Sequence, residues 1–268
     1  MADRQTIERL KDQALEMREL ILKLSAKTLI HLGGDLSMAD MMTALYMYKM
    51  KKNLDYDGKW PERDRFVLSK GHVCPAQYAA LAMKGFFPMK TLNTLRKEGS
   101  ILQGHPDMKK CPGIDISTGS LGQGLSCAVG MALAGKRDHK DYMVYAVVGD
   151  GEADEGQIWE AVMAAYRYHL DNLVVIIDNN GLQIDGTTDE IMPQLDLTKK
   201  FDAFGYDTYE IDGHNMEQIM ETFDKIHAAK DGRPKFINAH TVKGKGVSYM
   251  ENQLAWHGMA PNDEQYQQ

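Results

Sequence analysis

The sequence predicts an α/β fold in which a mostly parallel sheet is covered by helices on both faces. Segments typical of strands and of helices alternate between residues 142 and 241, which is the pattern of consecutive βαβ units. Several strand-like segments are nearly uninterrupted apolar runs, such as Val174 to Ile177, and such runs are typical of strands buried on both faces. With 268 residues, of which 43% are hydrophobic, the chain is long enough for one large α/β domain.

The first half of the chain is predicted to be mainly helical. An N-terminal helix is indicated by apolar residues at steps of three and four positions, namely Ile7, Leu10, Ala14, Met17, Ile21 and Leu24. Further helices are expected over residues 38–50, 75–87 and 122–136, and a short strand over residues 66–68. The helix within 75–87 should end at Gly85, because glycine readily adopts the left-handed conformation found after helix ends.

The second half of the chain carries the alternating pattern. Strands are expected at 142–149, 172–178, 207–211 and 234–241, and helices at 156–169, 195–203 and 215–229. The tail from about Val242 has no clear periodicity and is predicted to be mainly loop. Because no internal repeat or low-complexity linker interrupts the sequence, residues 1–268 are expected to form a single domain.

Composition excludes several classes of function. The net charge of −7 and the pI near 5.7 do not provide the basic surface that nucleic-acid binding needs. No apolar run approaches the roughly 20 residues of a membrane span, and the first residues are too polar for a signal peptide. Cys74, Cys111 and Cys127 form no CxxC pair and are typical of reduced thiols. We therefore expect a cytoplasmic protein without nucleic-acid or membrane partners.

An acidic turn, VVGDGEADEG at residues 147–156, is the first candidate for a functional site. Asp150 lies between two glycines at the carboxyl end of a predicted strand, where parallel sheets open a ligand-binding crevice. The next strand ends at Asn179 and Asn180. Hard oxygen donors from two neighbouring strand ends suit Ca²⁺ or Mg²⁺, and Mg²⁺ completes its shell with phosphate oxygens and water. The sequence therefore predicts a divalent cation that clamps a diphosphate.

The segment from Gly149 to Asn180 resembles the thiamine diphosphate motif of the transketolase-like enzymes, in which a strand, Gly-Asp-Gly, a helix and a second strand precede Asn-Asn. This resemblance implies a thiamine diphosphate-binding fold, with Mg²⁺ as the metal and Ca²⁺ or Mn²⁺ as alternatives. It implies metal ligation by Asp150, Asn180 and the backbone carbonyl of Leu182. It also implies that Gly151 contacts the diphosphate.

The other carboxylates of the turn are interpreted separately. Glu152 and Asp154 are expected to be solvated near the start of a helix, where the helix dipole favours negative charge. Glu155 matches a family glutamate that helps to link cofactor sites across the subunit interface. A position at the helix start explains Glu155 equally well.

Four histidines stand in loops beside glycine or proline: His31 in HLGGDLSMAD, His72 in LSKGH, His105 in QGHPD and His257 in WHGMAP. Each alone would ordinarily be a surface histidine, but the four together are hard to explain by packing. All four match active-site histidines of the family. The resemblance implies that His72 and His257 approach the cofactor and that His31 and His105 line the substrate channel. Imidazole near neutrality can donate or accept protons, so the four are predicted to be catalytic.

Two glycine-containing loops complete the predicted site. The segment TGSLGQG at 118–124 resembles the family's TGPLGQG, which implies backbone contacts from Gly119 and Leu121 to the diphosphate or the aminopyrimidine. A dinucleotide-binding loop is the alternative, but the spacing is GxxGxG and no clear strand precedes it. Lys243, in KGKG, is interpreted as a solvated loop lysine, with contact to an anionic cofactor or substrate as the alternative.

The resemblance covers nearly the whole chain but only part of a transketolase. In the family, a pyrimidine-binding domain with the glutamate that activates the cofactor follows, then a C-terminal domain. Most of the arginines that hold the sugar phosphate also lie there. We therefore expect the N-terminal subunit of a split transketolase, completed by a separate chain in an α₂β₂ assembly. The expected reaction transfers a two-carbon ketol unit from a ketose to an aldose, usually as phosphates.

Other interpretations remain open. The α subunit of a 2-oxo acid dehydrogenase shares the diphosphate motif but not the histidine-containing loops. Deoxyxylulose phosphate synthase is closer but is normally one chain, and a non-catalytic binding module is a third alternative. The sequence also departs from the family pattern at Leu29 and Ile30, where Ser-Gly is common, and at Leu32 and Ser120, where proline is common. These departures leave the cofactor chemistry in place and bear on substrate preference.

Overall fold

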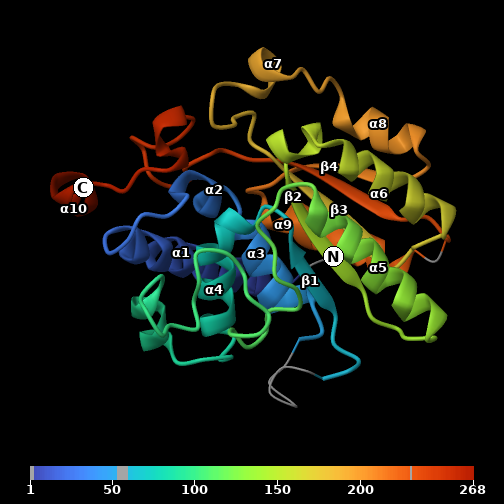
Figure 1. Ribbon diagram of the computed structural model, residues 1–268, viewed down its shortest axis with the longest axis horizontal. Coiled ribbons are helices and arrows are strands. Elements are labelled where there is room, and N and C mark those ends of the chain that lie inside the picture. Colours follow the sequence, from blue (N-terminus) through green and yellow to red (C-terminus); the bar gives the residue numbers. More distant parts are fainter. Residues whose placement is uncertain (1–2, 53–59, 230) are drawn as a thin grey trace.

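The computed structural model describes residues 3–52, 60–229 and 231–268. Within them, five strands form one fully parallel sheet in the order β1-β2-β3-β5-β4 (Figure 1). The strands are β1 (Arg65–Leu68), β2 (Val144–Gly149), β3 (Leu173–Asn179), β4 (Asp207–Asp212) and β5 (Lys235–His240). The predicted α/β fold with a parallel sheet is thereby confirmed.

Helices cover one face of the sheet from both halves of the chain. They are α1 (Arg4–Ser25), α2 (Leu32–Ser37), α3 (Ala39–Ala44), α4 (Cys74–Met83) and α9 (Met216–Ala228). Tyr145 and Val147 of β2 and Val174 and Ile176 of β3 pack into this helical layer and are fully buried. Their alternation along each strand follows the pleat, because successive side chains point to opposite faces.

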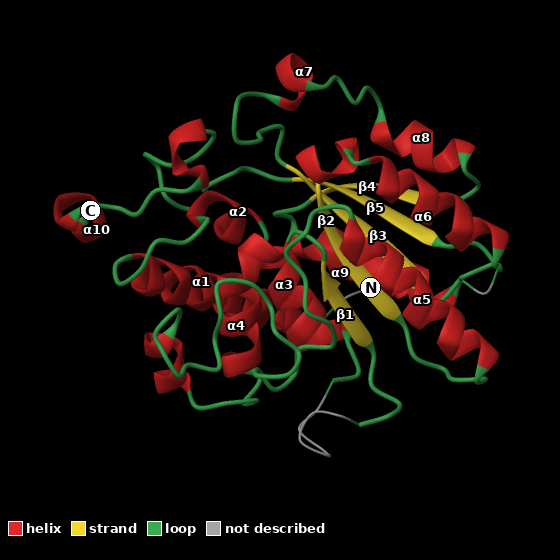
Figure 2. Cartoon of the chain, viewed as in Figure 1, coloured by secondary structure: helices red, strands yellow, loops and turns green. Residues whose placement is uncertain are grey.

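The opposite face is covered by α5 (Gln123–Arg137), α6 (Gly156–Arg167) and α8 (Leu197–Ala203). Figure 2 shows α5 and α6 lying across the sheet from α1, α3 and α4. Val148, Val175 and Ile177 belong to this second apolar core and are fully buried. Because both faces of the sheet are covered, the sequences of its central strands are nearly continuous apolar runs.

The N-terminal region differs from the prediction in two places. The helix predicted over 38–50 is divided, because α3 ends at Ala44 and a π-helical turn, Leu45–Lys49, follows it. Helix α2 was not predicted, since its two adjacent glycines have low helix propensity. Gly85 ends α4 as expected, with φ of 90° and the N–H of Phe86 donating to the carbonyl of Leu81 at 3.0 Å.

Residues after β5 are mainly irregular, with a 3₁₀ helix (Leu254–His257) and α10 (Asp263–Gln267). The segment nevertheless packs on the body of the protein, since Met250 and Trp256 are buried. A short helix, α7 (Thr188–Ile191), stands at the outer edge of the fold (Figure 1). Among the described residues, no helix is both long and apolar enough to cross a membrane.

Candidate active site

A cavity of about 470 Å³ opens at the carboxyl edge of the sheet. Lys70, Gly149, Asn180 and Lys243, which line it, lie at or just after the ends of β1, β2, β3 and β5. The lining includes ten of the residues predicted for the site, namely His31, His72, His105, Gly119, Leu121, Asp150, Gly151, Asn180, Leu182 and His257. The structure therefore brings together loops that are far apart in the sequence.

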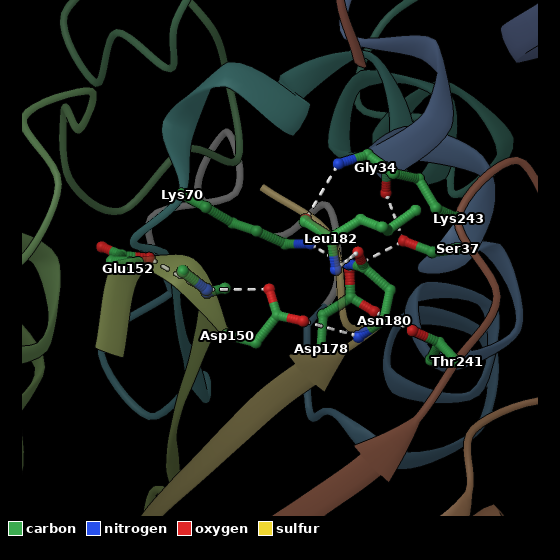
Figure 3. A network of polar contacts seen from close by, with 12 residues as sticks. Gly34, Ser37, Lys70, Asp150, Glu152, Asp178, Asn180, Leu182, Thr241 and Lys243 are labelled. Carbon is green, nitrogen blue, oxygen red and sulfur yellow. Dashed lines mark hydrogen bonds and ion pairs between the residues drawn. The ribbon is translucent and has the colours of Figure 1, made fainter. Parts of the chain in front are cut away.

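The carboxylate of Asp150 joins the loop after β2 to the loop after β3. One oxygen accepts the N–H of Gly151 at 2.8 Å, and the other accepts the N–H groups of Asn180 at 2.9 Å and Gly181 at 2.6 Å (Figure 3). Asp150 is 3% exposed, and burial together with the nearby charge of Asp178 raises its pKa to about 6. A cation at this position would relieve the cost of the buried negative charge.

The other two predicted metal ligands lie beside Asp150. The side-chain oxygen of Asn180 accepts the N–H of Leu182 at 3.2 Å. The carbonyl of Leu182 accepts a hydrogen bond from the ammonium of Lys243 at 3.0 Å. A carboxylate, an amide oxygen and a backbone carbonyl form a donor set that fits Mg²⁺ or Ca²⁺. Asn179 is turned away, because its amide donates to the side-chain oxygen of Asn238 at 3.0 Å.

Lys243 is part of the cavity wall, so its interpretation as a solvated loop lysine is wrong. The residue is 2% exposed. Besides Leu182, its ammonium contacts Nδ1 of His257 at 2.8 Å. Burial lowers its pKa to about 8. The prediction failed because the loop after β5 packs against α2. The N–H of Gly244 in this loop donates to the carbonyl of Gly33 in α2 at 2.9 Å.

A buried ion pair between Lys70 and Asp178 supports the cavity and was not predicted. The carboxylate of Asp178 is paired with the ammonium of Lys70 and accepts the hydroxyl of Ser37 at 2.7 Å and that of Thr241 (Figure 3). It also accepts the side-chain amide of Asn180 at 3.2 Å. One side chain thus ties β3 to α2 and to the loops after β1 and β5. The sequence feature that could have indicated this pair is the carboxylate of Asp178 directly after the apolar run Val174 to Ile177.

Glu152 is a structural anchor, and the prediction that it is solvated is wrong. Its side chain accepts the hydroxyl of Ser69 at 2.5 Å and the N–H groups of Gly122 at 2.9 Å and Gly149 at 3.1 Å. The residue is 3% exposed, and burial raises its pKa. These partners come from three separate segments, which sequence spacing does not reveal. Asp154 is half-buried and accepts the side-chain amide of Gln194 at 2.8 Å.

The loop at 118–124 lies directly against the cavity. Gly119 has a φ of 150°, and a Cβ at this position would lie 3.0 Å from the imidazole of His105. Gly119 and Leu121 line the cavity, and their predicted contacts with the diphosphate or the aminopyrimidine stay a prediction. Glu155 does not line it: its side chain is exposed at the start of α6 and close to Gly122. Its predicted role at a subunit interface stays a prediction.

Three of the predicted histidines form one cluster. The ring centroids of His31 and His72 are 4.8 Å apart, those of His31 and His257 are 5.5 Å apart, and those of His72 and His257 are 5.7 Å apart. Nδ1 of His31 is buried and has no hydrogen-bond partner among the described residues. A buried polar atom without a partner in a cavity wall fits a ligand-binding role.

The four cavity histidines are held in the neutral state. Burial is the largest cause in each case, followed by neighbouring positive charges. The pKa of His72 falls to about 2 and that of His257 to about 4. The pKa values of His31 and His105 are also lowered. A neutral imidazole has one N–H donor and one acceptor nitrogen, so each ring can both donate and accept a hydrogen bond.

The remaining histidines lie outside the cavity lining, namely His139, His169, His214, His227 and His240. They matched no functional motif. His214 has a structural position, because its Nδ1 contacts the carboxylate of Asp40 at 2.8 Å and its Nε2 accepts the N–H of Val242 at 2.8 Å. It thereby holds the start of the segment that carries Lys243.

The chain is similar to known transketolases and transketolase subunits. Residues 16–268 match the family model described as the transketolase thiamine diphosphate binding domain. The 6-deoxy-6-sulfo-D-fructose transketolase subunit SqwG of Clostridium sp. (strain MSTE9) is 48% identical over 258 residues, which cover 96% of this chain and 93% of that protein. An apulose-4-phosphate transketolase subunit of Phocaeicola vulgatus is 46% identical over 263 residues, covering 98% of this chain and 92% of that protein.

A solved structure shows the same fold. The chain superimposes on the transketolase from Leishmania mexicana with a TM-score of 0.88 at 33% sequence identity. The match covers 99% of this chain and 40% of that one. The chain therefore belongs to the transketolase family, in which it corresponds to the thiamine diphosphate-binding domain.

Proposed function

We propose that this chain binds thiamine diphosphate and Mg²⁺ and acts as the N-terminal subunit of a two-chain transketolase. The observation that carries the proposal is the meeting of Asp150, Asn180 and Leu182 with four neutral histidines in one cavity. The chain spans over nine tenths of two relatives named as transketolase subunits but 40% of a longer solved transketolase. We infer that the whole chain acts as one diphosphate-binding domain.

The proposed metal ligands are the carboxylate of Asp150, the side-chain oxygen of Asn180 and the carbonyl of Leu182. Gly119 and Gly151 line the cavity, and the absence of a Cβ at glycine allows a diphosphate to approach the backbone closely. Thiamine diphosphate, when bound, supplies a stabilised carbanion that breaks and forms the carbon–carbon bond. Ca²⁺ or Mn²⁺ could replace Mg²⁺ at a site of this chemistry.

The histidines are proposed to hold substrate hydroxyls and to move protons. His72 and His257 stand beside the two buried lysines, Lys70 and Lys243, and are assigned to the cofactor side of the cavity. His31 and His105 are assigned to the substrate channel. Each neutral imidazole has one N–H donor and one acceptor nitrogen, so each can hold a sugar hydroxyl or a carbonyl oxygen by a hydrogen bond along which a proton can move.

The proposed reaction moves a two-carbon ketol unit from a ketose to an aldose. One relative is named for apulose 4-phosphate and another for 6-deoxy-6-sulfo-D-fructose, and both names describe sugars with a terminal anionic group. We therefore propose an anionic sugar substrate, with a phosphate as the ordinary case. A separate chain with the pyrimidine-binding and C-terminal domains would complete the enzyme as α₂β₂.

The decisive experiment compares the purified chain with the chain mixed with its proposed partner. With Mg²⁺ and thiamine diphosphate, ketol transfer between sugar phosphates should be negligible for the chain alone and strong for the mixture. Asp150→Ala should abolish it in the mixture, whereas Asp138→Ala, at the exposed end of α5, should not. Full activity of the chain alone would refute the two-chain proposal, and turnover of pyruvate instead would favour a 2-oxo acid dehydrogenase.

A further inference from the structure

Arg96 lies between the two segments that lead into the proposed substrate-channel histidines. Its NH1 donates to the carbonyl of Leu29 at 2.7 Å, two residues before His31. On its other side, a Cβ at Gly104 would lie 3.1 Å from Nε of Arg96, and Gly104 directly precedes His105. Arg96 is not itself among the residues that line the cavity, but it packs against both segments that carry these two lining histidines.

The backbone at Arg96 is unusual. Its φ is 61°, in the left-handed region, which is uncommon for a residue with a long side chain. The conformation is held by its own N–H, which donates to the carbonyl of Leu102 at 2.9 Å. His139, His169, Leu195 and Asn252 also have positive φ and lie outside the cavity lining, so the conformation fixes the course of the chain at Arg96 and does not by itself mark a ligand site.

The positive charge of Arg96 is not neutralised by the part of the chain that the structure describes. The side chain is exposed, and no carboxylate among residues 3–52, 60–229 and 231–268 lies within ion-pair distance of it. The two lysines deeper in the cavity are engaged instead, Lys70 with Asp178 and Lys243 with Leu182. The charge of Arg96 nevertheless reaches the channel, because after burial it is the next cause of the lowered pKa values of His31 and His105.

The segment around Arg96 is basic although the chain as a whole carries a net charge of −7. Residues 84–110 contain six cationic side chains, namely Lys84, Lys90, Arg96, Lys97, Lys109 and Lys110, against the carboxylates of Glu98 and Asp107. A local excess of positive charge beside a cleft raises the local concentration of anionic ligands. The segment therefore favours entry of negatively charged molecules on the side of the cavity where His105 lies.

We propose that Arg96 recognises the terminal oxyanion, a phosphate or a sulfonate, of the sugar that enters the cavity. This inference rests on the proposed function. A guanidinium has five N–H donors in a planar fork that matches tetrahedral oxyanions. One donor is used at Leu29, and the others are available to the substrate. The reacting end of the sugar then lies among the histidines while its charged end extends beyond the lining to Arg96, so Arg96 determines specificity without touching the reacting atoms.

The test uses the complete two-chain enzyme with Arg96→Gln and Arg96→Lys. Glutamine can still donate to the carbonyl of Leu29 but carries no charge, and lysine keeps the charge without the fork. Three acceptor or donor sugars are compared: a phosphorylated sugar, a sulfonated sugar and an uncharged one. We expect Arg96→Gln to raise KM for the charged sugars by about tenfold or more, as for loss of a charge-assisted hydrogen bond. Because Arg96 also contacts the segments that carry His31 and His105, its loss can change kcat and KM for all three sugars. The readout is therefore the ratio of KM for a charged sugar to KM for the uncharged sugar, which should rise about tenfold in Arg96→Gln and by an intermediate amount in Arg96→Lys.

The matched control is Lys97→Gln, which removes the same charge from the next, also exposed, position and should leave every KM near the wild-type value. A rise in KM confined to one charged sugar would support the proposal and identify which oxyanion, phosphate or sulfonate, Arg96 recognises. An equal rise for the uncharged sugar, or no rise at all, would overturn it. Ketol transfer by the wild-type enzyme tests the proposed function separately. Inhibition by inorganic phosphate, weakened in Arg96→Gln but not in Lys97→Gln, provides a readout that needs no sugar discrimination.

Discussion

Lys70 and Asp178 form an ion pair whose side chains are 4% and 0% exposed, next to the proposed metal site. The other hydrogen-bonding positions of the carboxylate are filled by two hydroxyls and by the amide of Asn180. Pairs this deeply buried contribute little net stability, because desolvation offsets their attraction, but the loss of one partner is costly. The pair therefore fixes the position of Asn180 and of the loop after β1 relative to the sheet.

Asp178→Asn should destabilise the metal-free chain strongly. The substitution leaves the ammonium of Lys70 buried without a counter-charge, and the expected loss in the free energy of unfolding is about 3–5 kcal/mol. Urea unfolding followed by circular dichroism measures it. The control is Lys199→Gln, which breaks an exposed pair with Asp196 and should have little effect. Equal stability of Asp178→Asn and the wild type would contradict the buried pair.

Binding of Mg²⁺ should weaken in acid because of Asp150. The pKa of Asp150 is about 6 in the metal-free chain, and a proton competes with the metal for the carboxylate. Affinity should fall about tenfold per pH unit below about 6 and level off above it. Calorimetric titration with Mg²⁺ and thiamine diphosphate between pH 5 and pH 8 measures this dependence. An affinity that stays constant across this range would count against Asp150 as a ligand.

The raised pKa of Asp150 also predicts the direction in which folding stability changes with pH. The folded chain holds the proton of Asp150 more tightly than the unfolded chain, whose reference pKa is 3.8. Its contribution to stability therefore decreases as pH rises from about 4 to about 6. Asp150→Asn should remove this component from the pH dependence of urea unfolding, measured without metal. A decrease of the same steepness in Asp150→Asn would assign it to other groups.

His257 should have the opposite effect. Its pKa is about 4 in the folded chain against a reference value of 6.5, so the folded chain binds the proton less tightly. Stability should therefore be lost as pH falls from about 6.5 to about 4, and His257→Asn should reduce that slope. The imidazole signals of His257 in NMR spectra should not titrate between pH 5 and pH 8. A midpoint within that range would contradict the burial of this ring.

Two glycines of α5 should respond in opposite directions to alanine. A Cβ at Gly124 would lie 2.5 Å from Oγ and 2.6 Å from Cα of Ser69, so Gly124→Ala should cost about 1–3 kcal/mol of stability. A Cβ at Gly130 meets nothing within 4 Å, so Gly130→Ala should stabilise the helix by about 0.5–1 kcal/mol. Thermal unfolding of both variants measures the difference. Similar melting temperatures would show that α5 does not approach the loop after β1 this closely.

The fold could be predicted because its determinants are local. Apolar runs such as Val174 to Ile177 mark strands covered on both faces, and Gly85 marks a helix end, whatever the rest of the chain does. The division between α3 and the turn at Leu45–Lys49 could not be predicted, because a π-helical turn has no distinctive spacing of apolar residues. Helix α2 was missed because tertiary packing overrides the low propensity of its glycines.

The candidate site was predicted where a side chain stands in a recognisable motif, as for Asp150, Asn180 and the four histidines. Glu152 was misinterpreted because a carboxylate in an acidic turn is equally compatible with solvent and with buried amide partners. Those partners, at Ser69 and Gly122, are distant in the sequence. Lys243 was misinterpreted for the same reason. Neighbours brought together only by folding decide whether a charged residue is exposed.

The cavity depends on two parts of the fold. Its floor rests on strand ends tied together through Asp178, whereas Leu29, Arg96 and Gly104, near His31 and His105, belong to loops outside the sheet. Changes of sequence in these loops can therefore leave Asp178 and its contacts in place. A protein built in this way can come to accept different sugars through changes in these loops while it keeps the residues proposed for the coenzyme.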